Sequence, residues 1–271
     1  MTIWTAALFA LFVWWFSTGA ILWVVKTADR KGSGAGVKAT LMSLPMLVLG
    51  FVGYWISLND TSAFGACLAF LSALGIWGWI EVTFLTGLVT GPCRYALPSD
   101  TPEWERFLRA WGTLAYHEML LVTTLVILIL IGREGANIFG IWTFAVLFFA
   151  RLSAKFNLYL GVPYINVAFL PDALTHLATY FRRRSLNWLF PVSVSALTFA
   201  TACWLERVYM AQTDGQLIGF TLLTAITALA LLEHWMMVLP IPDEKLWRWM
   251  LPAPKQPTPK ATTLKGGHHG L

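Results

Sequence analysis

The sequence has few charged residues and no long polar stretch. Asp, Glu, Lys and Arg make up only 12% of the 271 positions, whereas soluble domains carry about 25%. Apolar residues account for 57% of the chain. Because no segment offers the polar surface that a soluble module needs, the composition predicts an all-α bundle embedded in a membrane.

Cysteine is scarce as well. Cys67, Cys93 and Cys203 form no CxxC pair, which excludes a cysteine-based zinc or iron–sulfur site. The net charge of +5 arises from residues between apolar runs and not from one clustered basic face, so a nucleic-acid-binding function is excluded. Internal repeats and paired broken helices are absent from the sequence, and a secondary transporter is therefore not supported.

Seven apolar segments are long enough to cross a bilayer, which requires about 20 residues per helix. They run over about 3–25, 39–58, 62–88, 107–131, 137–161, 185–207 and 215–239. Residues 1–251 are therefore predicted to form a single transmembrane domain. Residues 252–271, which are rich in proline and lysine, are predicted to be a disordered tail.

A further helix over about 171–184 is predicted to lie along the membrane surface. Pro171 and Asp172 are good helix-start residues, and apolar residues follow at helical spacing. These apolar residues are Leu174, Leu177, Ala178 and Phe181. Three basic residues close the segment and are expected to attract anionic lipid headgroups. They are Arg182, Arg183 and Arg184.

The basic residues alternate between successive loops. Of the 19 lysines and arginines, only Arg133 and Arg207 fall in the loops of one side. The others follow the first, third and fifth segments or belong to the tail. Because Lys and Arg accumulate in cytoplasmic loops, this alternation predicts an N-terminus outside and a C-terminus in the cytoplasm.

Ionisable residues inside the apolar segments are candidate functional residues, since each costs about 2.5 to 3.5 kcal/mol on insertion scales. Five could contact a ligand or pigment: Glu81, His117, Glu118, Glu233 and His234. Three others are expected to form a supporting polar network: Arg151, Lys155 and Asn157. At 1.5 Å per residue, the charged residues and histidines all fall in the cytoplasmic half, with His117 and Glu118 about 15 Å inside.

Three interpretations of this layer are open on the residues alone. In the first, the carboxylates pair with Arg151 and Lys155 and hold helices together. In the second, the five candidate residues bind iron or another divalent metal. In the third, a histidine is an axial ligand or hydrogen-bond donor to a tetrapyrrole, and Trp and Phe residues line the plane of that pigment.

Three stretches resemble the PuhE family of photosynthetic complex assembly proteins. They are FVWWFSTG at 12–19, ARLSAKFNLYLGV at 150–162, and LEHW at 232–235 followed by LP at 239–240. The likeness spans essentially the whole chain, and the 150–162 stretch is its most specific part. The resemblance assigns no catalytic residue.

The resemblance implies a multi-pass protein of the bacterial inner, intracytoplasmic photosynthetic membrane, with a periplasmic N-terminus. Such a protein is expected to help assemble the reaction centre and core antenna, to have their subunits as partners, and to contact bacteriochlorophyll or a precursor. The alternative hypothesis is an enzyme, a metal-dependent oxidase or hydroxylase that acts on a tetrapyrrole or another lipid-soluble substrate. The two hypotheses differ in whether the five candidate side chains converge on one point.

Overall fold

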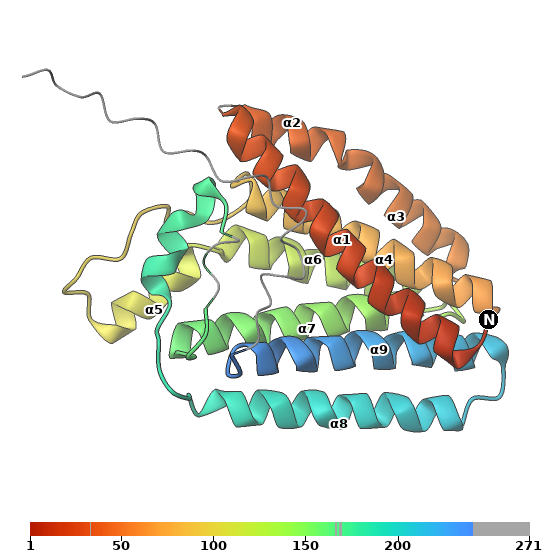
Figure 1. The fold of residues 1–271 in the computed structure, drawn as a ribbon. Coiled ribbons are helices and arrows are strands. Elements are labelled where there is room, and N and C mark those ends of the chain that lie inside the picture. Colours follow the sequence, from red (N-terminus) through yellow and green to blue (C-terminus); the bar gives the residue numbers. More distant parts are fainter. Residues whose placement is uncertain (33, 166, 168–169, 241–271) are drawn as a thin grey trace, which may run out of the picture.

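The computed structural model describes residues 1–32, 34–165, 167 and 170–240. Over these residues the chain forms nine α-helices and one 3₁₀ helix, η1, and no β-strand (Figure 1). The helices are α1 (Ile3–Lys31), α2 (Ala35–Met42), α3 (Leu44–Ser57), α4 (Ala63–Leu85), α5 (Glu103–Gly112), α6 (Ala115–Gly132), α7 (Phe139–Leu160), η1 (Asp172–Tyr180), α8 (Leu189–Tyr209) and α9 (Asp214–Met236).

Seven helical segments of the described chain are long and apolar enough to cross a membrane, and the predicted number is confirmed. Helices α1, α4, α6, α7, α8 and α9 each supply one segment, and α2 and α3 together supply the seventh, Ala35–Ser57. Pro45 lies in the first turn of α3, where its missing N–H disrupts no helical hydrogen bond. The chain is a multi-pass membrane protein.

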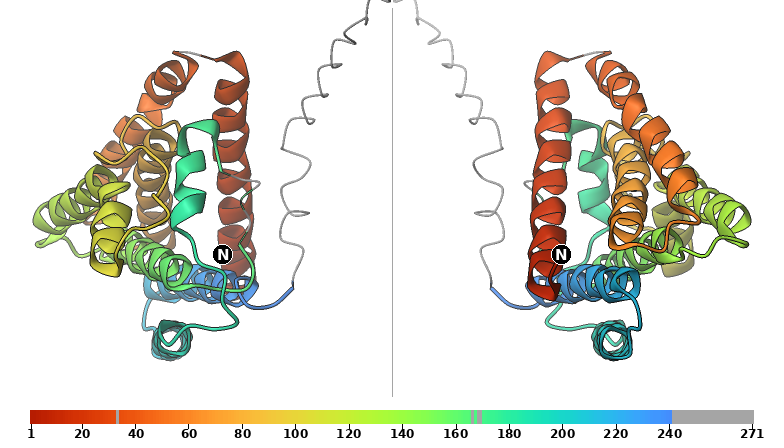
Figure 2. Two further views of the ribbon diagram at one scale, coloured as in Figure 1. Left: turned by 90° about the vertical axis from the view of Figure 1, so that its left-hand side faces the viewer. Right: turned by 90° about the vertical axis from the view of Figure 1, so that its right-hand side faces the viewer.

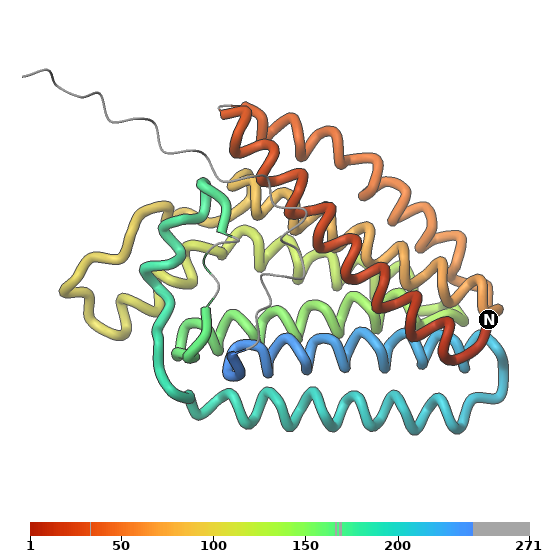
Figure 3. The backbone as a smooth tube through the Cα atoms, in the orientation of Figure 1, coloured from red at the N-terminus to blue at the C-terminus, as the bar shows by residue number. Residues whose placement is uncertain are grey.

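Helices α4 and α9 form the centre of the bundle. In each of them 56% of the most apolar window is buried, against 11% in α8. The backbone trace shows α7, α9 and α8 running side by side while α1 crosses them obliquely (Figure 3). Seen along the bundle, α8 lies at its outer edge (Figure 2). Side chains on α4 and α9 are therefore placed to meet groups from several helices at once.

Two glycines allow α3 to approach α4 closely. A Cβ atom at Gly53 would lie 2.4 Å from Ser72 Oγ, and one at Gly50 would lie 2.7 Å from Ile76 Cγ1. Small residues at helix interfaces let backbones pack without an intervening side chain, which is a main source of attraction between membrane helices.

The predicted span over 107–131 is divided in the structure. Helix α5 ends at Gly112 and α6 begins after it, so the backbone ladder is interrupted. The loop after α4 satisfies the freed groups: the Cys93 N–H donates to the Gly112 carbonyl at 3.1 Å, and the Thr90 carbonyl accepts from the His117 N–H at 3.0 Å. His117 therefore lies in the first turn of its span, roughly 3 Å along the helix and not the predicted 15 Å.

Helix α5 lies outside the spanning segments and exposes Trp104 and Trp111, residues that favour headgroup depth. On its buried face, Arg106 donates to the Tyr180 carbonyl and lies over the Tyr159 ring, 4.4 Å from its centroid. Burial lowers the pKa of Arg106, and the ring and carbonyl contacts compensate the desolvation. Arg106 thereby anchors α5 to η1 and α7.

The helix predicted over 171–184 differs in type and is shorter in the structure. The segment is the 3₁₀ helix η1, whose buried residues Leu174, Leu177 and Tyr180 recur every third position, as three residues per turn require. Its apolar face packs onto the bundle, where Leu174 and Leu177 form a cluster with Phe84 of α4. The position of the segment along the membrane surface stays a prediction.

The basic run after η1 is only partly available to lipid. Arg182 forms an ion pair with Glu103 of α5, while Arg183 and Arg184 are exposed. Binding of this run to lipid headgroups therefore stays a prediction for two of its three residues. The predicted tail over 252–271 lies outside the described residues.

Candidate functional site

The intramembrane polar residues gather at the end of the bundle where α5 and η1 lie (Figure 1). Helices α4, α7 and α9 end there and α6 begins there, so their polar residues belong to one layer. The predicted residues of this layer differ sharply in how well their hydrogen-bonding groups are satisfied.

Lys155 and Glu118 form a closed ion pair between α7 and α6. Lys155 Nζ donates to Glu118 Oε1 at 2.5 Å, and the two side chains are 16% and 13% exposed. The ammonium group also lies 5.7 Å from the centroid of the Phe84 ring. A short pair shielded from solvent matches the structural interpretation of the layer.

Arg151 and Glu81 form a looser pair between α7 and α4. Arg151 Nη2 lies 3.6 Å from Glu81 Oε2, and the arginine side chain is 45% exposed whereas that of Glu81 is 7% exposed. The 3.6 Å contact is beyond hydrogen-bond distance, and Glu81 Oε1 is buried without a hydrogen-bond partner among the described residues. The pair therefore leaves N–H donors of Arg151 and one carboxylate oxygen of Glu81 without a hydrogen bond.

His234 is buried with both ring nitrogens engaged. Nδ1 lies 2.8 Å from the Ala230 carbonyl, and Nε2 lies 2.9 Å from Ser153 Oγ. Since a carbonyl only accepts, Nδ1 carries the proton, and Nε2 of the neutral ring then accepts from the Ser153 hydroxyl. Neither nitrogen is left to bind a metal or a pigment.

His117 is the opposite case. Its side chain is fully buried, and neither Nδ1 nor Nε2 has a hydrogen-bond partner among the described residues. The ring stacks on Phe84 with 4.3 Å between centroids and 29° between planes. The Thr90 hydroxyl, next to His117, is also buried without a described partner. Buried polar groups are rarely left unsatisfied, so this group of atoms marks a place for water or another polar group.

Glu233 links α9 to α1 by accepting a hydrogen bond from Trp14 Nε1 at 3.0 Å. Sequence reasoning missed both Trp14 and Ser153, the partner of His234. Each lies within a stretch that carries the PuhE resemblance, 12–19 and 150–162, and that likeness was the signal that could have identified them.

Asn157 belongs to a separate network that joins α7 to α8. Its Nδ2 donates to Ser193 Oγ at 2.9 Å, and its Oδ1 accepts from Asn187 Nδ2 at 3.1 Å. Asn187 Oδ1 in turn accepts from the backbone N–H groups that start α8, those of Leu189 and Phe190. The predicted polar role of Asn157 is thus the positioning of a peripheral helix.

The five candidate ligands do not form a metal centre. Within the described residues, no group of three or more His, Cys, Asp or Glu side chains is placed to hold a metal ion. The carboxylates of Glu81 and Glu118 face cations, and His234 has no free nitrogen. The metal interpretation therefore lacks a set of three ligands among the described residues.

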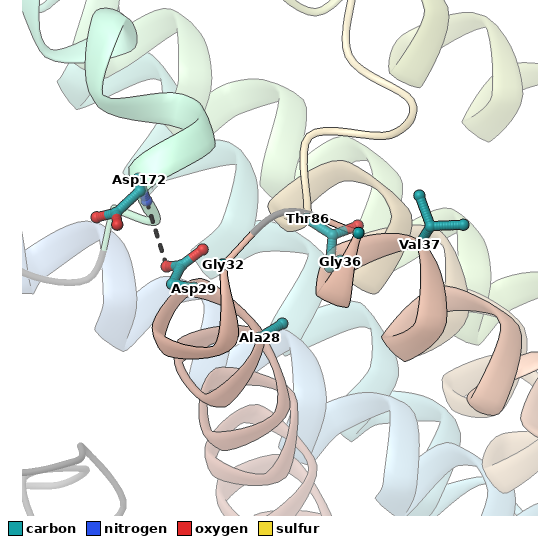
Figure 4. A pocket seen from close by; sticks show the side chains of 8 residues that line it. Ala28, Asp29, Gly32, Gly36, Val37, Thr86 and Asp172 are labelled. Atoms are coloured by element: carbon teal, nitrogen blue, oxygen red, sulfur yellow. Dashed lines mark hydrogen bonds between the residues drawn. The ribbon is translucent and has the colours of Figure 1, made fainter.

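A cavity of about 350 Å³ lies outside the layer, where the α1–α2 loop meets η1 (Figure 4). Gly32, Gly34, Asp29 and Asp172 contribute to its lining, and the Asp172 N–H donates to Asp29 Oδ2 at 3.2 Å. Gly32 and Gly34 have φ values of 80° and 81°, which glycine adopts without strain. None of the predicted site residues lines this cavity.

Comparison with known proteins gives one family and one curated relative. The family model described as "Protein of unknown function (DUF3623)" matches residues 1–258. The chain is also similar to the "Uncharacterized 30.4 kDa protein in puhA 5'region" of Rhodobacter capsulatus, with 55% identity over 254 residues, 94% of this chain and 93% of the relative. No solved structure matches.

Proposed function

The chain belongs to the DUF3623 family, and we propose that it is a membrane assembly factor for the reaction centre and core antenna of photosynthetic bacteria. The observation that carries this proposal is the location of the relative. The Rhodobacter capsulatus protein lies in the puhA region, a photosynthesis gene-cluster context, which supports a photosynthesis-related role. The resemblance to the PuhE family agrees with that role and supplies its finer form.

The proposal places the protein in the bacterial inner, intracytoplasmic membrane. The alternation of basic loops supports a periplasmic N-terminus and a cytoplasmic C-terminus. With this orientation the polar layer, α5 and η1 lie on the cytoplasmic side. Contact with bacteriochlorophyll or a precursor, and with reaction-centre or antenna subunits, would then occur in that half of the bilayer.

The geometry of the layer supports pigment contact better than metal catalysis. His117 and Arg151 retain unused nitrogen donors or acceptors at membrane depth, and aromatic residues such as Phe84 and Trp14 lie beside the layer. Polar groups with aromatic neighbours are the usual lining of small-molecule sites.

Replacement of the Rhodobacter capsulatus relative tests the function. We expect its deletion to lower the near-infrared absorbance of reaction centre and core antenna in isolated membranes, and expression of this chain to restore it. A His117→Leu variant should restore less than a matched Glu134→Gln variant at equal protein levels by immunoblot, because the Glu134 side chain is 83% exposed. Normal pigment complexes after deletion would overturn the proposal.

A further inference from the structure

Two arginines meet at the N-terminal end of α5, outside the polar layer and where α5 lies beside η1 (Figure 1). Arg106 of α5 and Arg182, which follows η1, both approach the carboxylate of Glu103. The charge of Arg182 lowers the pKa of Arg106, after the larger effect of burial. Among the described residues, one carboxylate thus serves as the acidic partner of two guanidinium groups.

Arg106 keeps one of its hydrogen-bonding groups unused. Its side chain is 6% exposed, and Nη2 donates to the Tyr180 carbonyl. Nη1 is buried without a hydrogen-bond partner among the described residues, and Glu103 Oε2, at 4.0 Å, is beyond hydrogen-bond distance. Because buried donors are rarely left unsatisfied, Nη1 indicates that an acceptor belongs between it and Glu103.

The start of α5 offers further donors at the same end. No side chain caps it, since Pro102 is the N-cap residue, and the first backbone N–H groups of an α-helix have no acceptor within the helix. Their partial positive charge favours an anion. Two acidic residues nearby have partners of their own: Glu105 pairs with Arg109 at 2.5 Å, and Asp100 accepts from the Ser99 hydroxyl at 3.3 Å.

Glu103 lies at the surface and can give way to another anion. Its side chain is 72% exposed, whereas that of Arg182 is 24% exposed. A phosphate group suits the two arginines, because its oxygens accept paired hydrogen bonds from the planar guanidinium fork. Phosphates are abundant in lipid headgroups, and Trp104, next to Glu103 and 68% exposed, is of a residue type that favours headgroup depth.

We propose that Arg106, Arg182 and the N-terminus of α5 bind a phosphate group, and that Glu103 is the internal anion that this phosphate displaces. Lipid headgroups and free phosphate share the chemistry, and the exposed Trp104 favours the headgroup. A bound headgroup ties both α5 and η1 to the membrane surface, because Arg106 also holds the Tyr180 carbonyl. Phosphate binding at this end of α5 is independent of pigment contact at the polar layer.

Calorimetric titration of the delipidated full-length protein in detergent micelles tests this site with three probes. They are phosphatidylglycerol, diacylglycerol with the same acyl chains, and inorganic phosphate. Diacylglycerol lacks the phosphate and should bind at least about tenfold more weakly than phosphatidylglycerol, because it cannot accept the charged hydrogen bonds. Inorganic phosphate should also bind more weakly than phosphatidylglycerol, because it has no acyl chains to contact the apolar surface beside the site.

Variants at the less buried positions keep the test independent of folding. Glu103→Gln removes the competing carboxylate and should bind phosphatidylglycerol at least as tightly as the natural protein. Added to Glu103→Gln, Arg182→Gln should weaken binding about tenfold to a hundredfold, the loss expected for hydrogen bonds from a charged donor. The matched control adds Arg183→Gln instead, at an exposed neighbour, and should weaken binding about fivefold or less, the general attraction of one basic residue for anionic lipid.

The probes and variants together separate a built site from general charge attraction. Phosphate-dependent binding that requires Arg182 far more than Arg183 supports the site. Binding of inorganic phosphate with the same requirement, and as tight as that of phosphatidylglycerol, supports the site and assigns it to free phosphate. Equal losses for the Arg182 and Arg183 replacements overturn it. Absence of binding by both phosphate probes, or equal binding of phosphatidylglycerol and diacylglycerol without binding of inorganic phosphate, overturns it as well.

Discussion

Two ion pairs one turn apart on α7 have opposite characters. Lys155 and Glu118 meet at 2.5 Å with both side chains largely buried, whereas Arg151 and Glu81 are 3.6 Å apart with the arginine 45% exposed. The same contrast separates the two buried histidines, since His234 has two hydrogen-bond partners and His117 has no described partner. One part of the layer is built for packing, and the other keeps polar groups available.

The largest effect on stability should come from removing one partner of the Lys155–Glu118 ion pair. Lys155→Met leaves the Glu118 carboxylate buried without its cation, and the expected loss is about 3 to 5 kcal/mol of unfolding free energy. Denaturation in detergent measures it. The double variant Lys155→Met with Glu118→Leu should recover most of the loss, because no charge is stranded. A double variant as unstable as the single one would contradict a purely structural role for this pair.

The two histidines should respond differently to the same substitution. His234→Phe removes two hydrogen bonds and leaves the Ser153 hydroxyl without its acceptor, whereas His117→Phe removes no described side-chain hydrogen bond and keeps a ring against Phe84. We expect the unfolding free energy to fall about 1 to 3 kcal/mol further for His234→Phe than for His117→Phe. Equal losses would show that His117 has a partner of its own.

The smallest effect on stability is expected for His176 in η1, the 3₁₀ helix that packs against Phe84. His176 of η1 has its pKa lowered, first by burial and then by the charge of Arg94. The unfolded state therefore binds a proton first as pH falls through about 6.5, so stability present above that pH is lost below it. Thermal unfolding between about pH 7.5 and about pH 5.5 should show a smaller decrease for His176→Asn than for the natural protein. An unchanged decrease would assign it to other groups.

The sequence predicts the spans because each crossing requires a long apolar run, and that requirement leaves a strong signal. The division between α5 and α6 leaves none, since Arg106 and Trp111 are compatible with continuation of a helix. The break is stabilised by backbone hydrogen bonds to Thr90 and Cys93 in the loop between α4 and α5. Likewise, helical spacing identified Leu174 as part of an apolar face but could not distinguish a 3₁₀ helix from an α-helix.

The sequence predicted which residues belong to the site but not which side chains contact one another. Membrane depth identified Glu81, His117 and Glu233 as unusual, because ionisable groups in apolar segments are costly wherever they occur. Their partners depend on how helices rotate against one another, which the roughly 100° step per residue does not determine. Trp14 and Ser153 are ordinary residues for a membrane helix. The family resemblance marks the stretches that contain them, and the structure shows that they are the partners of Glu233 and His234.

Cysteine accessibility tests the contrast between the two pairs most directly. Arg151→Cys and Lys155→Cys are each placed in a chain whose Cys67, Cys93 and Cys203 are replaced by alanine, and the rate of modification by a water-soluble methanethiosulfonate is measured in membranes. Thiolates react only where water reaches them, so position 151 should react at least about tenfold faster than position 155. Equal rates at the two positions would contradict the difference in exposure between Arg151, 45% exposed, and Lys155, 16% exposed.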